Sequence, residues 1–82
     1  MALSLSLQKV DETPRSCLYD LGTDAAVAAR VKLYKDSGDV EVVELSEASL
    51  PARPPFYLAQ GLPRLHSYHE QERYPDTDAW VA

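Results

Sequence analysis

The sequence predicts an α+β fold: a three- to four-stranded antiparallel sheet with one kinked C-terminal helix packed on one face. In the first half of the 82 residues, short segments alternate apolar with polar residues, which is the period of a half-buried strand, and turn residues separate them. In the second half, apolar residues follow the four-three-four spacing of an amphipathic helix. Because neither element buries its apolar side alone, we expect the helix to lie across the sheet.

The first two strands are expected at residues 3–10 and 15–21. In the first of them, three leucines alternate with two serines, so that every second side chain is apolar. Residues 11–14 form a turn, and so short a turn between two strands favours an antiparallel hairpin. Because the first strand has no proline and no charge before Lys9, we expect it to accept a further strand if it lies at the edge of the sheet.

Residues 25–34 allow two interpretations, a helix capped by Asp24 or a strand. A turn at residues 36–39 and a β-branched run at residues 40–45 favour the strand for the second half of this stretch. A four-residue loop with Gly38 in the left-handed conformation then determines the register of the hairpin. The expected pairs are Tyr34 with Asp39, Leu33 with Val40, Lys32 with Glu41 and Val31 with Val42.

A single domain over residues 1–82 is expected, because a chain of this length buries only one small core. The sheet takes residues 2–46. Residues 47–55 contain three prolines and form a connector, since prolines exclude a central strand. A helix at residues 56–72 and a tail at residues 73–82 complete the domain.

The helix is expected to turn Leu58, Leu62, Leu65 and His69 toward the sheet, with Tyr68 beside them. Gly61 and Pro63 lie in its middle. A proline inside a helix removes one hydrogen bond and crowds the preceding turn, so we expect these two residues to kink the helix or to split it into two short helices.

Four short motifs resemble a family of small uncharacterised bacterial proteins that is common in actinobacteria. They are Lys9-Val10-Asp11-Glu12, Lys35-Asp36-Ser37-Gly38-Asp39, Phe56-Tyr57 and Tyr74-Pro75-Asp76-Thr77-Asp78-Ala79-Trp80. Similar members end in an acidic-aromatic-Pro-Asp run followed closely by Trp. The resemblance covers nearly the whole chain and implies a stand-alone domain, with no function to carry over.

The charge disfavours nucleic acid and anionic membrane as partners. The chain has 8 basic and 13 acidic residues, a formal net charge of -5, and its basic residues are scattered. Phosphate binding needs a basic patch, which the sequence lacks. Most of the negative charge lies in the first 50 residues, so a partner steered by charge is expected to be basic.

One cysteine, Cys17, excludes an internal disulfide, and a small secreted domain usually needs several. The N-terminus has no basic region before its apolar residues, and no apolar run reaches the length of a membrane span. We therefore expect a cytoplasmic protein in which Cys17 is a small half-buried strand residue.

His66 and His69 are the candidate metal ligands, because two histidines three residues apart lie on one helix face. A third ligand would come from Glu70, Glu72 or Cys17. Pairing of Cys17 with either histidine is the one catalytic arrangement that the residue types allow, and no local signature supports it. We expect no catalytic site and no cofactor, and we keep a metal-binding or redox protein as an alternative.

The aromatic residues point instead to protein recognition, because tyrosine and tryptophan are enriched at interfaces. Tyr57, Tyr68, Tyr74 and Trp80 are the candidate residues for a patch that binds a partner protein or a second copy of the chain. In the other interpretation Phe56, Trp80 and one or two tyrosines complete the core, and Trp80 folds the tail back.

We expect a small acidic, non-catalytic binding module or accessory subunit that is a candidate homodimer. A second alternative is a small-ligand pocket between helix and sheet at the Gly61–Pro63 break, where Pro63 leaves the carbonyl of Ala59 without a donor.

Overall fold

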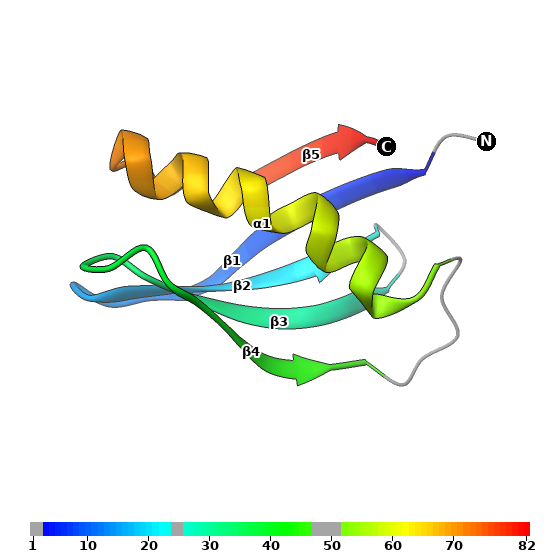
Figure 1. Cartoon of the computed structure of the whole chain (residues 1–82), viewed down its shortest axis with the longest axis horizontal. Coiled ribbons are helices and arrows are strands. Elements are labelled where there is room, and N and C mark those ends of the chain that lie inside the picture. Colours follow the sequence, from blue (N-terminus) through cyan, green and yellow to red (C-terminus); the bar gives the residue numbers. More distant parts are fainter. Residues whose placement is uncertain (1–2, 24–25, 47–51) are drawn as a thin grey trace.

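The fold is an antiparallel sheet of five strands with one helix across one face, as the computed structural model of residues 3–23, 26–46 and 52–82 shows (Figure 1). The strands lie side by side in the order β4-β3-β2-β1-β5. The α+β class, with an antiparallel sheet and a helix in the C-terminal third, is confirmed. The elements in chain order are β1 (Ser4–Glu12), β2 (Ser16–Gly22), β3 (Val27–Tyr34), β4 (Val40–Leu45), α1 (Pro54–Gln71) and β5 (Thr77–Val81).

The fifth strand corrects the prediction of three to four strands. The tail forms β5, which pairs with β1 so that Trp80 lies opposite Leu5 and Asp78 lies opposite Leu7. The hydroxyl of Tyr19 donates to the carbonyl of Pro75 at 2.8 Å and anchors the chain where it turns back. Two polar residues followed by three apolar ones do not give the alternation of a half-buried strand, so pairing with β1 decides the conformation of this segment.

The first strand is therefore not an edge strand, because β2 and β5 flank it on its two sides. The condition on which it would accept a strand from another chain, a position at the edge of the sheet, is not met. The edges of the sheet are β4 and β5.

The hairpin of β3 and β4 has the predicted register. Leu33 lies opposite Val40, Lys32 opposite Glu41 and Val31 opposite Val42. The amide of Tyr34 donates to the carbonyl of Asp39 at 2.9 Å, and Gly38 has a φ of 78°. Of the two interpretations of residues 25–34, the strand is confirmed from Val27 onward, whereas residues 24–25 lie outside the described residues.

The helix runs without interruption from Pro54 to Gln71, so of the two expectations for Gly61 and Pro63, a kink or a split, the split is wrong (Figure 1). It begins earlier than predicted, because prolines at the first helical positions lose no hydrogen bond there. Pro63 lies on the exposed side together with Ala59. The carbonyl that Pro63 leaves without a donor is therefore near water, where it is not costly.

Gly61 has a packing role. It is buried against β2, and a Cβ added at Gly61 would lie 2.9 Å from a terminal methyl carbon of Leu21. The absence of a side chain lets the helix backbone approach the sheet closely at this point.

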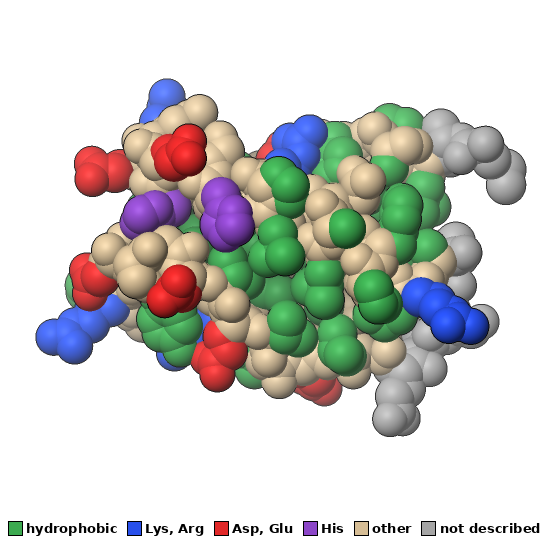
Figure 2. Space-filling view, viewed as in Figure 1, with side chains coloured by type: hydrophobic (Ala, Val, Ile, Leu, Met, Phe, Trp, Pro, Cys, Tyr) green, Lys and Arg blue, Asp and Glu red, His purple; other side chains and the backbone are tan. Residues whose placement is uncertain are grey.

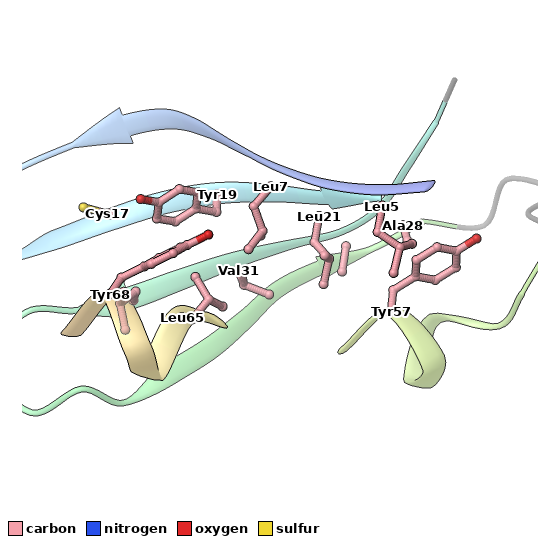
Figure 3. Packing of buried hydrophobic residues seen from close by; sticks show 12 residues of the cluster. Leu5, Leu7, Cys17, Tyr19, Leu21, Ala28, Val31, Tyr57, Leu65 and Tyr68 are labelled. Carbon is pink, nitrogen blue, oxygen red and sulfur yellow. The ribbon is translucent and has the colours of Figure 1, made fainter. Parts of the chain in front are cut away.

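The core lies between α1 and the middle of the sheet, and Figure 3 shows its side chains pointing toward one another from both layers. Tyr19 and Tyr68 are part of it, with ring centroids 5.8 Å apart. Phe56 is 36% exposed, which corrects the interpretation that places it in the core. The buried apolar residues are Leu5, Leu7, Cys17, Tyr19, Leu21, Ala28, Ala29, Val31, Leu33, Tyr57, Leu65 and Tyr68.

Replacing Gly38 by alanine is expected to destabilise the fold for two separable reasons. The positive φ alone costs a side-chain-bearing residue about 1–2 kcal/mol. In addition, the new Cβ would lie 2.7 Å from Nδ1 of His69. Chemical denaturation should give a smaller loss for G38A in a His69→Ala background than in the native chain. Equal losses in the two backgrounds would contradict the contact with His69.

Replacing Pro63 by alanine is expected to stabilise the protein by about 2 kcal/mol, because it restores an N–H to the helix interior while giving back some freedom to the unfolded chain. Thermal unfolding measures the effect as a rise in Tm. Alanine at Pro54, where no hydrogen bond is missing, is the matched control and should leave Tm nearly unchanged. A fall in Tm for P63A would contradict this account of the helix.

Candidate functional site

Two of the four predicted interface tyrosine and tryptophan residues belong to the core. Tyr57 and Tyr68 are buried, so they do not form a surface patch, whereas Tyr74 and Trp80 are half-buried and pack against the core. The helix turns Tyr57, Gly61, Leu65 and Tyr68 toward the sheet. Leu65 and Tyr68 are predicted there, whereas Tyr57 and Gly61 are not, so the buried side of the helix is rotated from the predicted one.

This rotation follows from Gly61, since the closest approach to the sheet occurs where the helix has no side chain. Leu58 and Leu62, which the periodicity predicts as core, are only partly buried on one flank of α1. His69 lies on the same flank and its ring packs on Gly38, which shows that this flank faces the β3–β4 side of the sheet.

The opposite flank of α1 is joined to β5 by a polar network. The hydroxyl of Tyr68 and Nη1 of Arg64 both donate to Oδ2 of Asp78, the latter at 2.8 Å. Partial burial of Asp78 raises its pKa, but these two hydrogen bonds outweigh burial and hold the pKa below its ordinary value. The guanidinium of Arg64 also lies 4.2 Å from the ring centroid of Trp80. The network therefore holds the tail on the helix.

A second network lies at the turn between β1 and β2. Glu12 accepts from Nζ of Lys9 at 2.7 Å and from Nζ of Lys35 at 2.6 Å, and Lys9 also pairs with Asp76 at 3.0 Å. The hydrogen bonds from Lys35 and Lys9 lower the pKa of Glu12 from 4.5 to about 2. Hydrogen bonds from Lys9 to Glu12 and Asp76 raise the pKa of Lys9.

Cys17 lies beside this second network, with its Sγ 3.7 Å from Oε2 of Glu12. Burial raises the pKa of the Cys17 thiol, and the charge of Glu12 raises it further. Cys17 therefore stays a thiol and Lys9 stays an ammonium, the forms in which neither side chain is a nucleophile.

The two histidines occupy different surroundings. His66 is exposed, whereas His69 is half-buried on Gly38. Within residues 3–23, 26–46 and 52–82, no three His, Cys, Asp or Glu side chains form a group that could hold a metal ion. The alternative of a metal or redox centre thus has no third ligand in the described part of the chain.

The expected ligand pocket at the helix break has no gap to occupy. The helix is continuous there, and the backbone of Gly61 lies directly on the side chain of Leu21.

The edge strand β4 is the feature that the sequence analysis missed. Val42 is 43% exposed, and Val43 and Leu45 are each 51% exposed. A bulge places Val43 as an extra residue, because Val31 pairs with Val42 and Arg30 pairs with Glu44. The run of β-branched residues predicts this strand, but nothing in the run shows that no other described strand pairs with its outer side.

We define the β4 surface as the partly or well exposed apolar residues of β4 together with the facing flank of α1. Figure 2 shows apolar side chains gathered between α1 and the β4 side of the sheet. Because the helix covers the middle of the sheet, these side chains are left without a covering element in the described chain. The residues of the β4 surface are Val40, Val42, Val43, Leu45, Leu58 and Leu62.

Four acidic residues lie in β4 or just before it. Asp36 and Asp39 precede β4, and Glu41 and Glu44 lie within it. Glu41 lies opposite Lys32 and accepts the hydroxyl of Tyr34 at 2.7 Å. Arg30 lies opposite Glu44, but it donates to both carboxylate oxygens of Asp20, at 2.7 and 3.1 Å. The edge of the sheet therefore combines exposed apolar groups with excess negative charge.

Comparisons with protein-family models, with curated proteins and with solved structures each return no match for this chain. In the part of the chain that the structure describes, no helix has the length and apolar character needed to cross a membrane.

The lowered pKa of Glu12 predicts that the folded protein loses stability in acid. Because its pKa is lowered in the folded state, Glu12 contributes stability that is complete above about pH 4.5 and is lost as the pH falls toward 2. We expect Glu12→Gln to be less stable than the native chain at pH 7 and to lose less stability over this pH window. Urea unfolding at a series of pH values measures both. Parallel pH profiles for the two proteins would contradict the prediction.

Proposed function

We propose that this protein is a non-catalytic protein-binding module and that the β4 surface receives its partner. One observation carries the proposal: β4 is an edge strand with exposed apolar side chains, next to an apolar helix flank. An edge strand has a row of backbone N–H and C=O groups without partners in its own sheet, and such an edge commonly accepts a strand from another chain.

The lack of protection at this edge supports the proposal. Proteins usually blunt an exposed edge with lysine, proline or a covering segment, and β4 has neither of the first two. Its protective devices are the bulge at Val43 and the charges of Glu41 and Glu44, and the residues before the bulge, Val40–Val42, keep a regular register. A strand of this kind is suited to pairing.

The other reactive groups of the domain support a non-catalytic function. Lys9 and Lys35 each donate to Glu12, and Asp78 accepts from Tyr68 and Arg64. These contacts hold turns and the tail in place.

The proposed surface differs from the tyrosine patch that the sequence predicts. Tyr57 and Tyr68 are core residues, and Trp80 is covered on one side by Arg64. The proposed binding surface is therefore formed by β4 and the helix flank beside it, and not by the three tyrosines and Trp80. A cytoplasmic setting and the resemblance to small bacterial proteins remain part of this proposal, but neither supports the choice of surface.

A photo-crosslinking amino acid placed at Val43 tests the proposal in the cells that make the protein. We expect position 43 to form an adduct of one defined mass. The matched control is Val81, which is 64% exposed on the opposite edge strand and should form none. Mass spectrometry identifies the attached chain, which is another protein or a second copy. Absence of an adduct at position 43, or equal adducts at both positions, would contradict the proposal.

A further inference from the structure

We infer that the segment received by β4 is an extended, basic segment of a different protein, in which apolar residues alternate with Lys or Arg. The inference rests on the proposed function and names the chemistry of its partner. It depends on the backbone of β4, on the different character of its two sides, and on its charge.

The register shows which backbone groups are available. In an antiparallel pair, hydrogen-bonded residues alternate with residues whose N–H and C=O point away from the neighbouring strand. Tyr34 and Asp39 form a hydrogen-bonded pair, as their 2.9 Å bond shows, so the pair of Lys32 and Glu41 is hydrogen-bonded as well. The alternate residues Val40 and Val42 therefore direct their N–H and C=O groups outward, away from β3.

The two sides of β4 require different side chains from an added strand. On the helix side, Val42 lies in line with the buried Val31, and the helix flank adds Leu62. An apolar side chain of the segment would extend this surface and shield it from water. On the other side lies the carboxylate of Glu41. Because neighbouring residues of a strand point to opposite sides, the segment must alternate apolar and basic residues.

The charge of β4 argues against a second copy as the occupant. β4 contains Glu41 and Glu44 and no basic residue. Two-fold antiparallel pairing of two β4 strands would bring four carboxylates into one strand pair, and like charges across a strand pair are destabilising. A basic segment replaces this repulsion with attraction. The net charge of -5 also speeds the association of such a segment with the protein.

A capped synthetic peptide of alternating lysine and valine is the probe, and the same peptide with glutamate in place of lysine is its control. Two-dimensional NMR of the full chain locates the binding. We expect the lysine peptide to shift the amides of Val40 and Val42 and to slow their hydrogen exchange, since they would become donors to the peptide. The glutamate peptide should bind much more weakly, and added salt should lower the affinity of the lysine peptide for the protein.

Charge reversal separates this inference from general attraction to an acidic protein. The double variant Glu41→Lys with Glu44→Lys should bind the lysine peptide with an affinity lower by about tenfold or more. The reason is that two attractive charge pairs become repulsive ones. The matched control has Glu70→Lys and Glu72→Lys, which change the net charge equally at exposed positions of α1 and at its C-cap. That control should retain most of the affinity. Circular dichroism confirms that both variants fold.

The outcomes distinguish the inference from the proposed function. Equal binding of both peptides at β4, failure of the lysine peptide to bind, or a dimer through β4 seen by light scattering would each overturn the basic partner. The proposed function would survive these results if position 43 still crosslinks. If the peptides leave β4 unaffected and position 43 also fails to crosslink, both are overturned.

Discussion

The close contact between Gly61 and Leu21 is the constraint on which the arrangement of the domain depends. A helix lies nearest to a sheet where it has the smallest side chain, so Gly61 determines which side of α1 is buried. Tyr57, Leu65 and Tyr68 then fall on the buried side and complete the core. The close approach at Gly61 is thus consistent with the set of helix residues that are buried.

The two flanks of the helix follow from this rotation. On one flank Arg64 reaches Asp78 and the ring of Trp80, so that the helix holds β5 against β1. On the other flank His69 packs against the β3–β4 loop, and Leu58 and Leu62 remain partly exposed. One edge of the sheet is tied to the helix by polar contacts, whereas the other edge retains exposed apolar groups. The asymmetry of the domain is therefore a consequence of how α1 is seated.

This asymmetry is also the physical basis of the proposed function. A core of this size is covered by a single helix, and one helix is too narrow to cover five strands. β4, at one edge of the sheet, keeps apolar side chains in water, at a free-energy cost that a partner strand would remove. The same strand has carboxylates on its other side, which limits the partners that match it.

The sequence by itself determined the α+β class, the β3–β4 register and the left-handed Gly38, because these depend on contacts between residues close in the chain. Only the tertiary structure decided that the tail is a strand, that Pro63 leaves the helix whole and that Tyr57 is buried. Each of these outcomes depends on what the residue or segment faces in the folded protein. The tail faces β1, Pro63 faces water and Tyr57 faces the sheet. The β4 surface belongs to the second group, since the order of the described strands, and not the residues of β4, places this strand at the edge of the sheet.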